Sequence, residues 1–279
     1  MRQQLQAASD SEHSRAYLAR LASLQLVEQL KQGDLELYWA ESSLIYDNPD
    51  KILNASDDTS GHMAPALNAL LSDVHSEALI VSSYFIPGKN GVHRFATWIN
   101  SGAKVTILTN SLAANDVPVV HAGYANYREP LIKAGVDLWE LQPSSTAAKK
   151  DIRNKDLPCS SQASLHAKTM IFDRDTLFVG SMNLDPRSLN LNTEIGVLIY
   201  SKPLAEFASD TFLKELPDHA WRLSLEPKQG FWGSSEQLIW LDESTQPATI
   251  VSHSSEPEAG RWSRFQAWIF GYLPLESML

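Results

Sequence analysis

Four side chains between positions 165 and 183 have the chemistry needed to handle a phosphate group. They are His166, Lys168, Ser181 and Asn183. An imidazole can serve as a nucleophile or proton carrier, while an ammonium, a hydroxyl and a carboxamide can donate hydrogen bonds to the non-bridging oxygens of a phosphoryl group. Each residue taken alone is more commonly a packed or solvated residue without a chemical role. Their combination in one short stretch favours the chemical interpretation.

The elements that must position these side chains are predicted to be the two arms of a β-hairpin. The first arm alternates between polar and apolar residues, so His166 and Lys168 project to the same face. Residues 173–176 form a polar cluster between two apolar arms, which is typical of a turn. The simplest prediction is a two-residue turn at Arg174 and Asp175.

That turn fixes an antiparallel register across the hairpin. It places Lys168 opposite Ser181 and His166 opposite Asn183, and directly opposed residues share a face. Gly180, without a side chain, would let a ligand approach the backbone closely. The register therefore predicts one small volume in which all four polar groups converge.

The rest of the chain predicts an α/β fold in which a mixed, largely parallel sheet is sandwiched between helices. Apolar runs typical of buried strands alternate with segments of helical periodicity, and this order indicates parallel strands joined by right-handed crossovers. Strands are predicted at 35–39, 43–46, 78–85, 104–109, 136–141, 193–200, 221–225 and 238–241, and helices at 14–31, 63–75, 91–100, 120–134 and 204–216; residues 47–61 and 142–164 are predicted loops.

Composition limits the classes of function. The chain has 43% apolar and 20% charged residues, as ordinary globular proteins do. A net charge of −10 argues against nucleic acid as the partner, because nucleic-acid binding needs a basic surface. A single cysteine, Cys159, excludes an intrachain disulfide, and no Cys/His cluster has zinc spacing, so no metal or other cofactor is expected. No apolar run approaches the roughly 20 residues that span a bilayer, so a soluble or peripheral protein is expected.

An amphipathic helix is predicted within residues 260–279, where Arg261 and Arg264 lie beside an apolar stripe. The stripe consists of Trp262, Phe265, Trp268, Ile269 and Leu273. Two interpretations stay open. The helix could cap the core of the domain, or it could lie at a membrane interface with its arginines near anionic head groups.

The motif as a whole resembles a known signature. It spells His-x-Lys-x4-Asp-x6-Gly-Ser-x-Asn, carried by His166, Lys168, Asp173, Gly180, Ser181 and Asn183. This resembles the HKD motif of the phospholipase D superfamily. The stretches at 82–87, 121–141 and 181–199 and the closing residues further resemble the C-terminal half of bacterial cardiolipin synthases, most like the C type.

The resemblance implies a phospholipase D-like fold, with residues 1–60 as an N-terminal helix and connector. Residues 61–217 would form a catalytic half-domain, and residues 218–279 would complete it with strands and an amphipathic helix. It also implies a phosphohistidine intermediate at His166, with no cofactor. A second histidine, from a second copy of the motif, would protonate the leaving alcohol.

Other site residues receive roles on the same basis. Lys168 and Asn183 would stabilise the phosphoryl oxygens, and Ser181 with Gly180 would complete the cradle. We expect Glu194, on the following strand, to accept a hydrogen bond from His166 and to fix its tautomer. Asp173, at the hairpin turn, is expected to hold the motif rather than to touch substrate. Three residues on one helix face are candidates for a head-group channel, although helix packing explains Tyr124 equally well: His121, Tyr124 and Arg128.

Only one His-x-Lys motif is present, so we expect the chain either to pair with a second copy or to be the second half of a longer enzyme. The implied reaction is phosphatidyl transfer between phosphatidylglycerol and a second phospholipid, which gives cardiolipin at the cytoplasmic side of the bacterial inner membrane, with the enzyme peripheral. Two other hypotheses remain: a homodimeric phosphodiesterase or nuclease, and an inactive remnant or binding subunit. A serine hydrolase is disfavoured because no Gly-x-Ser-x-Gly elbow is present.

Overall fold

The chain divides into two compact units, Met1–Trp39 and Ala40–Leu279. Nearly all of the described residues belong to the second unit. The computed structural model describes residues 30, 32–33, 37–53, 58–72, 74–143, 164–230, 233–244 and 250–271.

Some predicted features fall wholly or mainly outside these residues. They are the helix over 14–31, the loop over 142–164, Cys159 and Leu273. Residues 37–39, the described part of the strand predicted at 35–39, are not in a strand.

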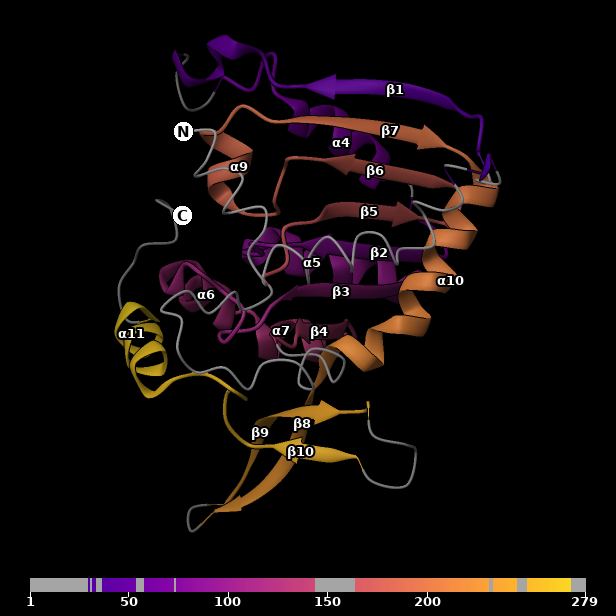
Figure 1. Ribbon diagram of the computed structural model, residues 1–279. Coiled ribbons are helices and arrows are strands. Elements are labelled where there is room, and N and C mark those ends of the chain that lie inside the picture. Colours follow the sequence, from indigo (N-terminus) through magenta and orange to yellow (C-terminus); the bar gives the residue numbers. More distant parts are fainter. Residues whose placement is uncertain are drawn as a thin grey trace, which may run out of the picture. The chain divides into compact units, whose positions relative to one another are not determined.

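A ten-stranded mixed sheet forms the centre of the described part of the second unit. The strands lie in the order β1-β7-β6-β5-β2-β3-β4-β8-β9-β10 (Figure 1). Their bounds are β1 Glu41–Tyr46, β2 Glu77–Ser82, β3 Lys104–Asn110, β4 Asp137–Leu141, β5 Lys168–Phe172, β6 Thr176–Gly180, β7 Ile195–Tyr200, β8 Ala220–Gly230, β9 Gly233–Asp242 and β10 Val251–His253.

The predicted α/β class and the mixed sheet are confirmed, but the parallel part is smaller than expected. Only β2, β3 and β4 pair in parallel, which gives two of the nine strand pairs among the described residues. The reason is connection length. Short turns join β5 to β6 and β8 to β9, and a short connection can join only antiparallel neighbours.

Helices cover both faces of this sheet. Their bounds are η1 Pro49–Leu53, α4 Met63–Leu71, α5 Gly88–Asn100, α6 Pro118–Ala125, α7 Arg128–Lys133, α9 Pro186–Asn190, α10 Lys202–His219 and α11 Arg261–Gly271. The helix predicted over 120–134 is divided into α6 and α7. Pro130 explains the division, because it cannot donate the backbone hydrogen bond that would continue α6, whereas proline is tolerated in the first turn of a new helix.

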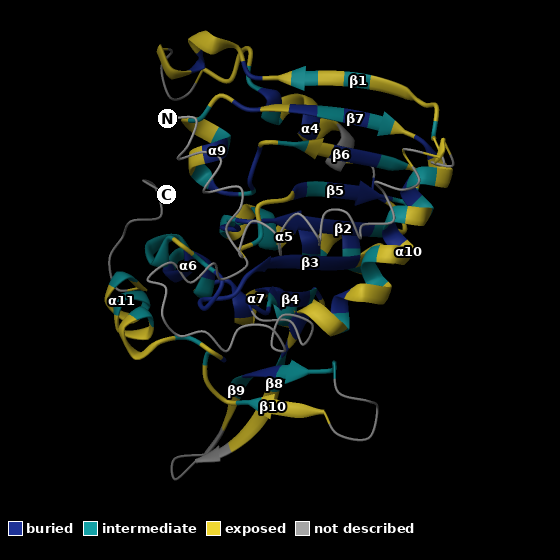
Figure 2. Cartoon of the chain, viewed as in Figure 1, coloured by how far each residue is buried: buried dark blue, intermediate teal, exposed yellow. Residues whose placement is uncertain are grey.

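The core has one layer on each side of the central strands. On one face, α4 and α5 pack over residues such as Ile80, Ile107 and Met170. On the other face, α10 packs over residues that include Leu79 and Ile171. The central strands are accordingly buried on both sides, as Figure 2 shows for β2 and β3. This is the predicted sandwich.

The sheet brings the motif to one end of the molecule's central layer. Strands β2, β3 and β4 are parallel, and β5 is antiparallel to β2 with Lys168 opposite Ser82. The carboxyl ends of β2, β3 and β4 therefore lie at the same end as the beginning of β5. Helices α6 and α9 lie at this end in Figure 1. Ligands of α/β sheets commonly bind beyond the carboxyl ends of the strands.

Candidate active site

The hairpin forms as predicted, but its register differs by one residue. Thr169 lies opposite Val179, so continuing the ladder places Lys168 opposite Gly180 rather than Ser181. The predicted two-residue turn is wrong, because Asp173 and Arg174 both adopt positive φ angles of 49° and 57°. Asp173 and Arg174 are the two central residues of the tight turn, and the Asp175 N–H closes it by donating to the Phe172 carbonyl at 3.1 Å. Because Phe172 pairs with Thr176, Asp175 has no opposed residue and the loop contains three residues instead of two.

The chain beyond β6 nevertheless carries Asn183 to the sheet end where β5 begins. After Gly180 it leaves the ladder and crosses toward the end of β2, where Leu184 forms a parallel bridge with Phe85. The Leu184 N–H donates to Ser82 Oγ at 3.0 Å, and the Ile86 N–H donates to the Leu184 carbonyl at 2.7 Å. Asn183 is thereby delivered to the same sheet end as Lys168 by this crossing segment.

Gly180 serves the packing of the sheet. A Cβ at this position would lie 2.5 Å from the Ile195 carbonyl oxygen and 2.7 Å from the Phe178 ring. The expectation that Gly180 opens the backbone to a ligand is therefore corrected, since the space beside it is filled by β7 and by Phe178.

His166 and Lys168 lie beside one another. Lys168 Nζ is 3.3 Å from His166 Nδ1, and it donates to the His166 carbonyl at 3.0 Å and to Ser83 Oγ at 3.1 Å. The Lys168 side chain is buried, with 8% of the residue exposed, whereas His166 is exposed. Burial lowers the pKa of Lys168, against the opposing effect of the nearby carboxylates of Glu194, Asp185 and Asp116. Because Lys168 approaches Nδ1, the ring nitrogen away from the ammonium is Nε2.

Asn183 presents an oriented amide. Its Oδ1 accepts a hydrogen bond of 3.4 Å from the Tyr84 N–H, so its Nδ2 group is left to donate elsewhere. The Tyr84 hydroxyl donates to Asp116 at 2.8 Å. Burial and the Asp116 carboxylate raise the pKa of Tyr84 to about 12. A second hydrogen-bonding pair thus borders the same site.

Glu194, which was predicted to accept a hydrogen bond from His166, is paired with Ser181 instead. The Ser181 hydroxyl donates to Glu194 Oε2, and Ser181 Oγ accepts from the Ile195 N–H at 3.0 Å. Among the described residues, Glu194 is therefore bonded to Ser181 and not to His166. The backbone of Glu194 is fixed on both sides by Asp47, whose N–H donates to the Glu194 carbonyl at 2.8 Å and whose Oδ2 accepts from the Glu194 N–H at 2.8 Å.

Asp173 acts at the far end of the hairpin. Its carboxylate accepts hydrogen bonds from the N–H groups of His75, Ser76 and Glu77, just before and at the start of β2. Burial would raise its pKa, but these N–H donors hold it below the usual value. Ala167 and the five residues of β5 separate Asp173 from His166, so the two residues lie about 23 Å apart along the strand. Its contacts tie the turn to β2.

Asn110 is a positioning residue that the sequence did not single out. It ends β3 and is almost fully buried, with 1% exposed. Its Oδ1 accepts from the Leu165 N–H at 2.9 Å, and its Nδ2 donates to the carbonyls of Leu165 at 3.1 Å and Ser83 at 3.0 Å. Leu165 directly precedes His166, so this amide fixes the entry to β5. The sequence feature that could have identified Asn110 is its place as a polar residue at the carboxyl end of a buried strand, where ligand sites of α/β sheets commonly lie.

The three residues proposed for a head-group channel lie in a closed cluster. His121, Tyr124 and Arg128 are 1%, 2% and 4% exposed. Arg128 donates to Glu140 at 2.8 Å and to Glu256 at 2.6 Å, and its Nη2 lies 2.7 Å from His121 Nε2.

In that cluster the charges satisfy each other. Burial alone would lower the pKa of Arg128, but Glu140 and Glu256 raise it well above the ordinary value. The Arg128 guanidinium also lies 5.0 Å from the centre of the Tyr124 ring. The cluster joins α6 and α7 to β4 and to the segment before α11, so a structural role accounts for Arg128. The Tyr124 hydroxyl and His121 Nδ1 are buried without a hydrogen-bond partner among the described residues. Contact with a head group stays a prediction.

Two kinds of feature are absent from the described residues. No group of three or more His, Cys, Asp or Glu side chains in them is arranged to hold a metal ion. None of their helices has the length and apolar character needed to cross a bilayer.

Sequence comparison gives matches to known proteins. The family model described as "Cardiolipin synthase, PLD-like domain" matches residues 67–216. The chain is 37% identical over 265 residues to cardiolipin synthase C of Escherichia coli (strain K12), covering 94% of this chain and 53% of that protein. It is 23% identical over 203 residues to cardiolipin synthase B of Shigella flexneri, covering 67% and 44% respectively. The chain thus spans about half the length of the curated relatives it matches.

Solved structures are similar to this chain as well. Phosphatidylserine synthase of Haemophilus influenzae Rd KW20 has a TM-score of 0.47 and 18% identity, covering 65% of this chain and 40% of that chain. The phospholipase D family member Nuc from Salmonella typhimurium has a TM-score of 0.45 and 14% identity, covering 65% of this chain and 97% of that chain.

Proposed function

Because the chain belongs to the family of cardiolipin synthase PLD-like domains, we propose that it is a phosphatidyltransferase half-domain that contributes one of two His–Lys pairs to cardiolipin synthesis. The observation that carries the proposal is the exposed His166 imidazole beside the buried Lys168 ammonium, 3.3 Å apart at the carboxyl end of the sheet. Residues 61–217 form the proposed catalytic half-domain, and residues 218–279 complete it.

The proposed reaction has two displacements at phosphorus. In the first, His166 attacks the phosphodiester of a phospholipid, a nitrogen–phosphorus bond forms, and the bond from phosphorus to the head-group oxygen breaks. The departing oxygen takes a proton from a histidine of the second motif. In the second, that histidine removes the proton from a hydroxyl of phosphatidylglycerol, whose oxygen then attacks phosphorus and releases His166. Splitting the transfer in this way replaces one difficult step with two easier ones.

The neighbours of His166 would stabilise the charge on the phosphoryl oxygens. Lys168 holds its ammonium within reach of the imidazole, and its ligands, Ser83 and the His166 carbonyl, are neutral. The positive charge is therefore available to an incoming phosphate. The Nδ2 group of Asn183, which has no partner among the described residues, would supply a further donor. Attack through Nε2 requires the ring proton on Nδ1, so we expect substrate to draw Lys168 away from that nitrogen.

A partner carrying the second motif has a surface to occupy. Leu44, Tyr46, Val179 and Ile195 lie on one face of strands β1, β6 and β7, because they are in register across the ladders or alternate along the same strand. These four side chains are 58%, 59%, 44% and 52% exposed. The same face is covered further along by α10. An uncovered apolar area of this kind supports docking of a second half-domain or a second copy.

The C-terminal helix supports action at a lipid surface. Trp262, Phe265, Trp268 and Ile269 of α11 are 67%, 47%, 60% and 38% exposed, and the helix packs beside α6. This exposure disfavours the interpretation that the stripe caps the core. An exposed aromatic stripe next to arginine is typical of helices that lie in a membrane interface. This supports a peripheral position at a membrane, and we propose that the membrane is the bacterial inner membrane, approached from its cytoplasmic side.

The test is covalent capture of the intermediate. The chain, alone and mixed with a second HKD-bearing half, is incubated with vesicles of radiolabelled phosphatidylglycerol and analysed for acid-labile phosphohistidine. We expect labelled protein and cardiolipin formation from the wild type and neither from His166→Ala. His93→Ala, at an exposed position of α5, serves as the control and should behave as the wild type. Equal turnover by His166→Ala would rule out the proposed nucleophile.

A homodimer with one motif per chain remains the second candidate, supported by the single His-x-Lys motif. It would complete the site without another protein. Sedimentation at micromolar concentration separates the two, since this candidate requires a dimer that hydrolyses a diester without a partner.

A further inference from the structure

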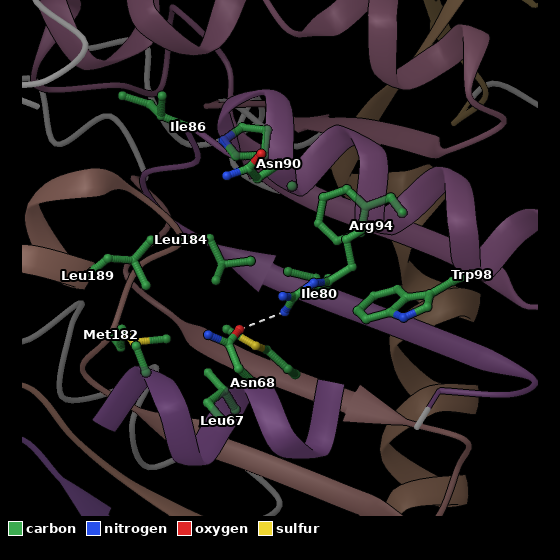
Figure 3. Close-up of a pocket in the computed structure, with 15 residues that line it drawn as sticks. Leu67, Asn68, Ile80, Ile86, Asn90, Arg94, Trp98, Met182, Leu184 and Leu189 are labelled. Carbon is green, nitrogen blue, oxygen red and sulfur yellow. Dashed lines mark hydrogen bonds between the residues drawn. The ribbon is translucent and has the colours of Figure 1, made fainter. Parts of the chain in front are cut away.

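An apolar cavity lies between α4, α5 and the sheet. Its volume is about 290 Å³, and the side chains around it include Leu67, Ile80, Trp98, Met170 and Leu184. Figure 3 shows these elements surrounding the space, with Leu67 on α4 and Trp98 on α5 among the lining side chains. Small-molecule sites begin at about 300 Å³, so this cavity, at about 290 Å³, is close in volume to the smallest of them.

The cavity adjoins the catalytic end of the sheet along β2 and β5. Ser82 is opposite Lys168, and the next opposed pair on the same face is Ile80 and Met170, both of which line the cavity. Two residues along a strand span about 7 Å. The apolar space therefore begins one side-chain pair away from the ammonium that would hold the phosphoryl group.

The segment that carries Asn183 also forms part of the wall. Met182 and Leu184, on either side of Asn183, both line the cavity. Leu184 is fixed by the hydrogen bond that its carbonyl accepts from Ile86 at 2.7 Å. The same short segment thus presents a polar amide to the proposed phosphate site and two apolar side chains to the cavity.

The polar lining residues mark the mouth. Asn68 and Asn90 are exposed, and Arg94 is half-buried and donates to Asn68 at 2.6 Å, as the dashed line in Figure 3 shows. Asn90 is in the first turn of α5, soon after the chain leaves the carboxyl end of β2. The part of the mouth at Asn90 is therefore near the sheet end that carries His166, whereas Asn68 and Arg94 lie midway along α4 and α5.

We propose that this cavity binds one fatty acyl chain of the phospholipid whose phosphodiester reacts at His166, an inference that rests on the proposed function. The apolar walls suit a hydrocarbon chain, and the polar mouth suits the ester and glycerol groups that follow it. A dry cavity of roughly 150 Å³ holds benzene, so a space of this size takes about a dozen chain carbons. The cavity would select an acyl-bearing diester over a water-soluble one.

Binding of a single-chain lipid tests the proposal without requiring turnover. Lysophosphatidylglycerols from octanoyl to palmitoyl are titrated below their micelle concentrations and followed by calorimetry. We expect affinity to rise about fourfold per methylene up to about a dozen carbons and then to level off, because further carbons stay outside the cavity. A rise that continues unchanged to palmitoyl would overturn the proposal.

Two matched alanines on α4 provide the control. Ala64 lines the cavity and is half-buried, whereas Ala66 is exposed on the same helix and does not line it. Ala64→Phe should lower lauroyl affinity about tenfold or more and abolish the dependence on chain length, while Ala66→Phe should bind as the wild type. Equal binding by the two variants would overturn the proposal.

The position of the bound chain is checked in the wild type, which keeps the test valid if Ala64→Phe does not fold. A chain brominated near its middle should quench Trp98, and Trp98→Phe should remove that quenched component. Quenching that survives in Trp98→Phe would place the chain elsewhere, such as on Trp262 or Trp268 of α11, and would overturn the proposal. His166→Ala should keep the chain-length dependence while losing turnover, so failure of the cavity and failure of the phosphatidyltransferase are told apart.

Discussion

Two clusters in this protein combine a histidine, a cation and carboxylates, and they differ in how completely the cation is paired. In the first, Arg128 contacts Glu140 and Glu256, and the adjoining His121 is 1% exposed. In the second, Lys168 donates to a hydroxyl and a carbonyl, and the adjoining His166 is exposed. Among the described residues, no carboxylate lies within ion-pairing distance of Lys168.

The difference shows how residue type and charge environment must be considered together. Both clusters drew the same expectation of phosphate or head-group contact, since both offer a histidine and a cation within a few residues. A cation that is already paired with two carboxylates is neutralised and attracts a phosphate weakly. Removing such a cation leaves the buried carboxylates without a charge partner. A cation held by neutral ligands can bind an anion with little loss. The paired cluster therefore stabilises the fold, and the unpaired one suits chemistry.

The largest expected effect comes from breaking the paired cluster. Arg128→Met should lower the free energy of unfolding by about 3–5 kcal/mol, because Glu140 is fully buried and would lose its charge partner. Urea denaturation measures the loss. Arg222→Met, which breaks a half-exposed pair with Asp137, is the control and should cost at most about 1 kcal/mol. A similar small loss in Arg128→Met would contradict the structural role.

Removing the cation of the unpaired cluster should lower activity and leave the free energy of unfolding nearly unchanged. Lys168→Met should reduce cardiolipin formation by the assembled enzyme about 10²–10³-fold, since one donor to the phosphoryl oxygens is lost. Its free energy of unfolding should change by less than about 1 kcal/mol, because no charged partner is stranded.

Lys51 gives the matched comparison for Lys168, since it is also buried but forms a 2.8 Å ion pair with Asp47. Lys51→Met should destabilise the fold strongly, in the manner of Arg128→Met. If Lys168→Met destabilised the protein as much as Lys51→Met, the contrast between the clusters would fail.

Asn110 allows an intermediate case, in which a buried neutral residue supports the unpaired cluster. Asn110→Ala removes two hydrogen bonds to Leu165 and one to Ser83, so the free energy of unfolding should fall by about 1–3 kcal/mol. Misplacement of His166 should lower kcat more than it raises KM. Asn100→Ala, at the exposed end of α5, should change neither. A change in KM alone would contradict a positioning role.

The sequence predicted those parts of the fold that depend on local pattern. A continuous apolar run identified β2, and the alternation of strand and helix identified β3 and β4 and gave the parallel order of the three strands correctly. The register of the hairpin was missed, because Asp173 and Arg174 rather than Arg174 and Asp175 adopt the turn conformation. Nothing in a polar run of four residues decides which two take positive φ angles.

Pairing between distant residues was the other limit. Glu194 bonds to Ser181 rather than His166, and Asn110 reaches Leu165 across 55 positions. Such partners follow from where strands end in three dimensions, which residue spacing along one strand cannot give. The closed state of Arg128 likewise depends on Glu140 and Glu256, far away in the sequence.

The smallest expected effect is a pH dependence that reports the environment of Lys168. Burial holds the pKa of its folded form below the ordinary value of about 10.4, so the ammonium is lost at lower pH than in an exposed lysine. Anion binding should therefore weaken as pH rises through that lowered pKa, by up to tenfold per pH unit. Affinity for tungstate, a phosphate analogue whose charge is constant above neutral pH, measures this in the chain alone.

The origin of this pH dependence is checked with two variants. Lys168→Arg should move the loss of affinity beyond the accessible range, because a guanidinium keeps its charge. Tyr84→Phe should leave it in place, because the pKa of Tyr84 is raised to about 12 and its hydroxyl stays protonated over the same range. A pH dependence that persisted in Lys168→Arg would mean that another group controls anion binding, and Lys168 could no longer be regarded as the available cation that distinguishes this cluster from that of Arg128.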